Sequence, residues 1–340
     1  MPVHDNLGIR MKENYENVAK TKLVRRMPVA IRIDGKAFHT FTKGFKKPFD
    51  EILIKSMQET TKYLCENIQG CVFGYTQSDE ITLILVDYEK LETCAWFDYE
   101  VQKLCSISAS MATMAFNKFF AKNVDEWYDE NYSYNTNELN TTYQKAICKG
   151  AMFDARCFNI PKEEVTNLIY WRQLDAIRNS IQMVAQSQFS HKEIQGLSCN
   201  ELQNKLLTEK DINWNDYPIV MKRGSACIKN PNGKWFIDEK MPILKENDRK
   251  YVNKLIFVGE NMKLNYFLYM NEAEGTGLVN TRADRIETAI KDFIMMAKAG
   301  HNINDDDIQT AILEDHNIEN VTPRECKYIA KRVDAVLSKK

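Results

Sequence analysis

Short apolar runs alternate with longer amphipathic stretches along most of this chain. Residues 29–33, 71–75, 81–86 and 153–158 are short, apolar or β-branched and bounded by turn residues, which predicts strands. Residues 7–20, 49–67, 99–121 and 163–188 carry apolar side chains at helical spacing and predict helices. The order strand, helix, hairpin, helix predicts an α+β fold in which helices pack on one face of an antiparallel sheet, as in a polymerase palm.

The remaining segments follow from turn residues and composition. Residues 76–80 predict a hairpin turn, and the turn 230–233 joins strand-like runs at 226–229 and 234–237. The Asn-, Tyr- and Thr-rich stretch 129–144 predicts an exposed loop. Beyond 281 the pattern indicates only helices, at 282–299, at 305–313 and from Thr322 with Pro323 in its first turn. We therefore expect a palm-like domain over 1–255 and a mainly helical extension over 256–340.

Two acidic positions stand where predicted strands end. Asp34 follows the strand 29–33, and Asp79 lies in the hairpin turn. Carboxylates on adjacent strand ends can hold two divalent cations for phosphoryl transfer. Glu80 is their neighbour, but side chains alternate between the faces of a strand, so Glu80 is less suited to the same ions. Taken singly, these residues are also typical of turns.

Composition indicates an ordinary soluble protein. The chain has 340 residues, is 44% hydrophobic and 27% charged, and carries a formal net charge of -1. No run approaches the roughly 20 apolar residues of a membrane span, and nine cysteines without a CxxC pair indicate a reducing compartment. With no signal or transit peptide evident, we expect a cytoplasmic protein without a membrane partner. The basic run at 20–26 is either a solvated helix end or a phosphate contact of a nucleic acid.

Six motifs occur in an order that resembles the tRNA(His) guanylyltransferase family over roughly residues 5–255. They are RIDGKAFH at 32–39, Lys47-Pro48 followed by Asp50, QSDE at 77–80, FDAR at 153–156, WRQ at 171–173 and KRG at 222–224. The segments 7–16 and 36–45 are most similar to the guanylyltransferase-like proteins of that family. Its members add nucleotides to the 5′ end of tRNA in the 3′-to-5′ direction on a palm-like domain.

The resemblance implies a set of site residues. Asp34, the carbonyl of Gly35 and Asp79 would bind two Mg²⁺ ions with help from Glu80. ATP and GTP or other nucleoside triphosphates would be substrates, tRNA the partner, and the assembly a homotetramer. The nucleotide would be bound by the segment 34–39 and by single residues beyond it, with Lys103 and Arg156 neutralising the triphosphate: Asp34, Gly35, Lys36, Ala37, Phe38, His39, Lys47, Ser78, Asp79, Lys103, Arg156 and Asn179.

One departure from the family bears on the substrate. Members that add a G to tRNA(His) carry a His-Ile-Asn-Asn-Leu-Tyr-Asn run where this chain has residues 177–183, and Ile177 replaces the histidine. This favours template-directed repair of 5′-truncated tRNA, after ATP activation of a 5′-monophosphate, over addition of the G-1 nucleotide to tRNA(His). A palm-type nucleotide cyclase and a catalytically idle RNA-binding protein are the alternatives of other classes.

Overall fold

The computed structural model describes residues 6–90, 92–131, 137–245 and 248–258, and positions 286, 289–294, 329, 331 and 333. The chain divides into two compact units, Met1–Lys263 and Leu264–Lys340. The described positions of the second unit are helical. The predicted helix at 305–313 and the predicted helix start at Thr322 lie outside the described residues, and the domain division at 255 stays a prediction.

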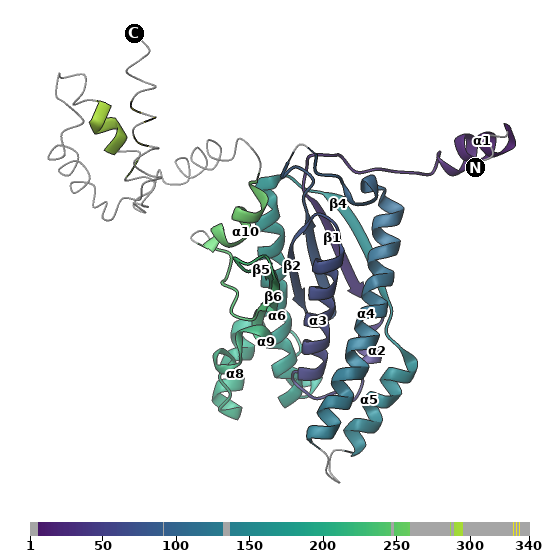
Figure 1. The fold of residues 1–340 in the computed structure, drawn as a ribbon. Coiled ribbons are helices and arrows are strands. Elements are labelled where there is room, and N and C mark those ends of the chain that lie inside the picture. The colour runs from purple at the N-terminus through teal and green to yellow at the C-terminus, as the bar shows by residue number, and fades with distance from the viewer. Residues whose placement is uncertain are drawn as a thin grey trace. The chain divides into compact units, whose positions relative to one another are not determined.

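A six-stranded sheet forms the centre of the first unit (Figure 1). All its pairs are antiparallel, and the strand order is β4-β1-β3-β2-β5-β6. The first strand therefore lies between the hairpin and a strand from much later in the chain. The strands are β1 Val29–Gly35, β2 Cys71–Gln77, β3 Glu80–Leu85, β4 Phe153–Asn159, β5 Ser225–Lys229 and β6 Trp235–Asp238.

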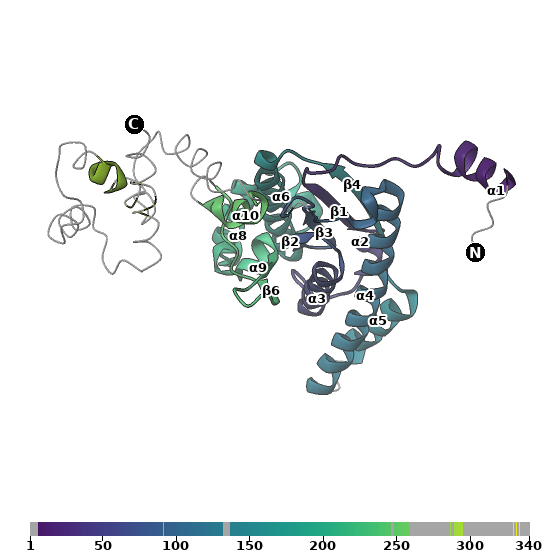
Figure 2. The ribbon, with the colours of Figure 1, turned by 45° about the horizontal axis from the view of Figure 1, so that its top comes forward.

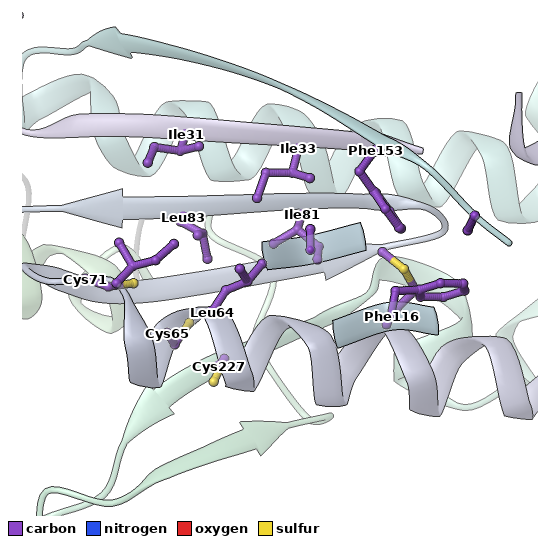
Figure 3. Packing of buried hydrophobic residues seen from close by; sticks show 14 of the residues in the cluster. Ile31, Ile33, Leu64, Cys65, Cys71, Ile81, Leu83, Phe116, Phe153 and Cys227 are labelled. Atoms are coloured by element: carbon purple, nitrogen blue, oxygen red, sulfur yellow. The ribbon is translucent and has the colours of Figure 1, made fainter. Parts of the chain in front are cut away.

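Helices cover both faces of this sheet (Figure 2). On one face, α3 (Glu51–Asn67) and α4 (Val101–Glu130) form an apolar core with Val29, Ile31 and Ile33 of β1, and Figure 3 shows part of this core. The helix α5 (Asn137–Lys149) packs on α4 and adds Tyr143 and Ala146 to the same core. On the other face, α6 (Lys162–Gln188) and α10 (Lys250–Ile256) pack against Ala30 and Ile84. The predicted α+β fold with helices on an antiparallel sheet is confirmed. The expectation that only one face is covered is wrong, because the central strands are apolar on both sides.

The shorter helical segments lie between these elements. They are α1 Asn6–Met11, the π-helical turn Lys12–Glu16, α2 Phe38–Phe41, the 3₁₀ turn Trp96–Tyr99, α7 His191–Ile194, α8 Cys199–Lys210, the 3₁₀ turn Trp214–Asp216 and α9 Ile219–Arg223. The helix predicted over 7–20 is thus shorter, and the loop predicted over 129–144 is wrong where α5 forms. Tyr143 and Ala146 are buried on one side of α5, so a polar composition concealed an amphipathic helix.

Among the described helices, none combines the length and the apolar character that crossing a bilayer requires.

The eight cysteines within the described residues are free thiols. Cys105 Sγ lies 3.6 Å from Cys157 Sγ and joins α4 to β4 without a covalent bond.

Asp50 fixes the start of α3 next to the predicted site. Its side chain is 6% exposed and accepts hydrogen bonds from the backbone N–H of Leu53 at 3.0 Å and of Lys46 at 3.1 Å. The hydroxyl of Tyr143 donates a third, at 2.7 Å. One carboxylate therefore caps α3 and ties it to α5.

We predict that Asp50→Ala lowers the free energy of unfolding by about 2–4 kcal/mol, from the lost cap and the unpaired buried hydroxyl of Tyr143. Urea denaturation measures this change. The control Asp125→Ala removes an exposed aspartate of α4 and should change stability by less than about 0.5 kcal/mol. Equal stability of the two variants would refute the assigned role of Asp50.

Candidate functional site

Antiparallel pairing gathers four acidic residues at one end of β1. Asp34 stands opposite Glu80 of β3 on one side and opposite Asp154 of β4 on the other. Asp79 occupies the two-residue loop between β2 and β3, and its carbonyl accepts a hydrogen bond from the N–H of Gly35 at 3.1 Å. The fold thus brings Asp34, Gly35 and Asp79 together, as the sequence predicts.

Gly35 is required by close packing at this point. A Cβ on Gly35 would lie 2.2 Å from a ring carbon of Phe38, which is buried in the core. After Gly35 the chain turns through Ala37, whose φ of 55° is left-handed, into the short helix α2. Among the described residues, the N–H groups of Ala37, Phe38 and His39 meet no acceptor. They are free to bind an anionic ligand.

The electrostatics of the acid pair favour a bound cation. Burial is the main cause that raises the pKa of Asp34 above its ordinary value, and the charges of Glu80 and Asp154 add to it, against the lowering effect of Arg156 and Arg32. Burial likewise raises the pKa of Asp79, although Ser78 Oγ donates a hydrogen bond to its carboxylate at 2.9 Å. Negative charge is therefore in excess here, and a cation would relieve it.

The donor set matches a magnesium site of the kind shared with a substrate. Among the described residues, no group of three or more His, Cys, Asp or Glu side chains is arranged to hold a metal. Mg²⁺ usually binds proteins through one or two carboxylates and takes its other ligands from phosphates and water. Two carboxylates and the Gly35 carbonyl therefore fit a Mg²⁺ ion that takes its other ligands from a substrate and water.

Glu80 is held by two arginines. Arg172 of α6 donates from Nη2 to Glu80 Oε2 at 2.7 Å. Its Nε lies 2.7 Å from Oε1, although the N–H is not aligned on that oxygen. Arg32 Nη2 lies 2.9 Å from Oε2. The side chains of Glu80 and Arg172 are 9% and 6% exposed, so this is a buried charge cluster. Direct metal binding by Glu80 stays a prediction.

Sequence patterns alone indicate no role for Asp154, Arg172, Arg32 or Asp175, and the structure brings all four to the site. Asp175 binds the Nη2 of Arg172 at 2.8 Å and thereby extends the cluster along α6. Arg172 and Asp154 did lie inside the motifs at 171–173 and 153–156. Their roles were hidden because the partners come from distant strands.

The other predicted nucleotide ligands lie at different distances from the acids. Arg156 Nη2 is 3.0 Å from Asp154 and 3.8 Å from Asp34, and Ser78 adjoins Asp79. Lys36 and His39 are exposed on the segment after β1. Arg156 and Ser78 therefore adjoin the acid pair, and Lys36 and His39 follow Asp34 in the chain.

Three predicted ligands make no contact with the acid pair. Lys47 is exposed just before the cis peptide bond to Pro48, and Asn179 donates to Asp175 at 3.4 Å. Lys103 pairs with Glu100 at 3.7 Å. It lies ten residues before Thr113, the residue of α4 that meets the acid end of β4, which is about 15 Å along the helix. Their nucleotide contacts stay predictions.

The basic run at 20–26 is engaged within the chain. Arg25 lies 2.6 Å from the buried carboxylate of Asp87 and 3.2 Å from Asp98, which also pairs with Lys22. Lys20 pairs with Glu16 at 3.3 Å. Lys22 and Arg25 thereby fasten the segment before β1 to residues that follow β3, which favours a structural role over a nucleic-acid contact.

Comparisons with known proteins agree with this geometry. The sequence profile of the tRNA(His) guanylyltransferase family matches residues 9–161. A bacterial tRNA(His) guanylyltransferase-like protein solved in complex with ATP is 44% identical, with a TM-score of 0.64, over 74% of this chain and 100% of that one. The chain belongs to the tRNA(His) guanylyltransferase family. Members of this family are nucleotidyltransferases, so the chain is an enzyme of that class.

Further family relatives span a wide range of organisms. A bacterial guanylyltransferase-like protein in complex with GTP is 40% identical, with a TM-score of 0.60, over 75% of this chain and 100% of that one. The tRNA(His) guanylyltransferase of Saccharomyces cerevisiae is 28% identical over 215 residues, which are 59% of this chain and 82% of that enzyme. The predicted family membership and enzyme class are confirmed.

We predict that Asp34→Asn and Asp79→Asn are at least as stable as the wild type at pH 7 in metal-free buffer. Both carboxyl groups have raised pKa values in the folded state. Protonation of these carboxyl groups therefore stabilises the folded state at a pH below their ordinary pKa of about 3.9. This contribution to stability is lost as the pH rises through the raised pKa values of the folded state. Thermal unfolding in the presence of a chelator measures the effect.

Magnesium supplies the control for that experiment. Adding Mg²⁺ should raise the unfolding temperature of the wild type and not that of either variant, because binding to the folded state stabilises it. The variant Asp125→Asn should respond like the wild type. A wild type that gains nothing from Mg²⁺, or variants that unfold well below it without metal, would argue against the assignment.

We predict that Arg172→Met costs about 3–5 kcal/mol of stability, because it leaves the buried carboxylate of Glu80 short of a partner. The matched control is Arg178→Met on the same helix. Arg178 also pairs with Asp175, but its side chain is 61% exposed, so its loss should cost at most about 1 kcal/mol. Urea denaturation of both variants compares them. Similar losses of stability in the two variants would show that burial of the Glu80 cluster does not make its ion pair with Arg172 more important for stability.

Proposed function

We propose that this chain is a two-metal nucleotidyltransferase that adds nucleotides to the 5′ end of tRNA in the 3′-to-5′ direction. The observation that carries the proposal is the pair Asp34 and Asp79, two carboxylates with raised pKa values on neighbouring segments that the hydrogen bond from the Gly35 N–H to the Asp79 carbonyl joins. Family membership supports tRNA as the partner, and the ATP and GTP complexes of two similar proteins support nucleoside triphosphates as substrates.

Asp34, Asp79 and the Gly35 carbonyl would hold two Mg²⁺ ions. When bound, the ions would lower the pKa of the attacking hydroxyl and neutralise the leaving group. The protein would supply the rest of the nucleotide site. The free N–H groups of residues 37–39 suit phosphate oxygens, as does Ser78 Oγ. Glu80, fixed by Arg172 and Arg32, would position the β3 end of the site.

Arg156 suits the triphosphate by its contacts. Its guanidinium faces Asp34 and Asp154, and it can bind a phosphate through two parallel hydrogen bonds once a cation occupies the carboxylates. Lys103 lies about 15 Å along α4 from Thr113, and it keeps the triphosphate role that the family resemblance implies. Lys47 and Asn179 keep the nucleotide roles that the family resemblance implies.

The residue type at position 177 supports repair over addition of the G-1 nucleotide, because Ile177 stands where members that add this nucleotide carry a histidine. Ile177 packs against the apolar cluster of Phe49, Ile181 and Val184. We propose that the enzyme extends 5′-truncated tRNA by pairing the incoming nucleotide with the opposite strand. A 5′-monophosphate would first be activated by ATP. A homotetramer is proposed from the family alone, and light scattering tests it.

We predict that the wild type extends a 5′-truncated tRNA with the nucleotide complementary to the opposite strand, and that Asp34→Ala and Asp79→Ala reduce this about a thousandfold. Metal-bound carboxylates supply several kcal/mol of transition-state stabilisation, and about 1.4 kcal/mol corresponds to a tenfold change in rate. The assay follows labelled nucleotides transferred to truncated tRNA in the presence of Mg²⁺ and ATP.

The substrate panel separates the alternatives. Addition of G to full-length tRNA(His) without extension of truncated tRNA would replace repair by the guanylyltransferase activity. RNA binding without any transfer would indicate an idle binding protein. Persistent transfer by either alanine variant would refute the metal ligands. The control Asp125→Ala should retain full activity.

A further inference from the structure

Trp171 is exposed at a place where its neighbours are buried. Its side chain is 52% exposed, whereas the next two residues of α6, Arg172 and Gln173, are 5% and 0% exposed. A tryptophan buries a large apolar area whenever it can. Half of this one faces solvent, next to a charge cluster that is shielded from it.

Two guanidinium groups lie over the Trp171 ring. The Cζ of Arg172 lies 4.5 Å from the ring centroid, and the Cζ of Arg32 lies 5.4 Å from it. Both arginines are bound to Glu80 and cannot swing away without breaking buried ion pairs. Cation–π attraction therefore holds the ring in place before any ligand arrives.

Trp171 lies on the same face of the sheet as the acid pair. Arg32, which contacts the ring, and Asp34 are two positions apart on β1, so they point to one face with their Cα atoms about 7 Å apart. On β4, Arg156 stands opposite Arg32 and Asp154 opposite Asp34. The exposed ring is thus within the reach of one nucleotide from the proposed metal ligands.

We propose that the exposed face of Trp171 stacks a nucleobase of the substrate at the reacting end. An aromatic ring fixed beside cations is the usual platform for a base, and stacking accepts every base because each has a π-face. This suits an enzyme whose choice of nucleotide is set by pairing with the opposite strand. The proposal rests on the proposed function, and the base belongs either to the incoming triphosphate or to the RNA.

The competing explanation is that Trp171 only covers the Glu80 cluster. A cover requires apolar area but no aromatic ring, so Trp171→Leu would preserve the cover. Stacking requires an aromatic ring, which Trp171→Phe keeps and Trp171→Leu removes. The two substitutions therefore separate the explanations. Phe236→Leu, which removes a 39% exposed aromatic side chain from the edge strand β6, is the matched control.

The test measures equilibrium binding of GTP, ATP and a 5′-truncated tRNA to each variant, together with KM and kcat. We expect Trp171→Leu to weaken binding about 5- to 100-fold, as loss of one stacked base does, with an unchanged unfolding temperature. Trp171→Phe should retain most of the affinity, and Phe236→Leu all of it. Weaker triphosphate binding assigns the base to the incoming nucleotide, and weaker RNA binding alone assigns it to the RNA.

Three results would overturn the proposal. They are unchanged binding of every ligand by Trp171→Leu, equal losses in the Phe and Leu variants, and losses that follow a lowered unfolding temperature. If Trp171→Leu does not fold, fluorine NMR of fluorotryptophan-labelled protein decides instead, with the Trp171 signal assigned through Trp171→Phe. That signal must shift on ligand addition. Binding needs no turnover, so a wild type that binds but adds no nucleotide refutes the proposed function and leaves the stacking proposal standing.

Discussion

Repulsion among the carboxylates at the end of β1 is the constraint on which this site depends. Asp34 lies between Glu80 and Asp154 on the neighbouring strands, and Asp79 adjoins it in the hairpin loop. Two of the four charges are offset within the protein, Glu80 by Arg172 and Arg32 and Asp154 by Arg156. Asp34 and Asp79 keep an excess of negative charge, which prepares the site for cations carried in with phosphates.

The helix α6 carries both Arg172, which neutralises Glu80, and Trp171, the residue proposed to stack a nucleobase. Successive residues of a helix point about 100° apart, so Arg172 can enter the buried cluster while Trp171 faces outward. The helix is anchored on both sides of this point, by Val165 and Ile169 on the sheet and by Ile181 and Val184 against α8. The rigid positions of both side chains follow from that anchoring.

The proposed metal ligands and the residue proposed to bear on the substrate lie on different elements. The proposed metal ligands belong to β1 and the β2–β3 loop, whereas Ile177, which distinguishes this chain from members that carry a histidine there, belongs to α6. Such a division allows the substrate to change while the reacting atoms stay in place. The close match to guanylyltransferase-like proteins and the weaker match to the yeast guanylyltransferase agree with it.

The sequence by itself determined the strands and the hairpin with Asp79 in its loop, because each depends on short-range patterns. Only the tertiary structure showed that Asp154 faces Asp34, that Arg172 neutralises Glu80, that α5 is helical and that Lys103 stands away from the acids. Arg172 and Glu80 are 92 positions apart. Contacts of this kind leave no periodic signal, since they are fixed by strand order and by the burial of charge, which are properties of the assembled sheet.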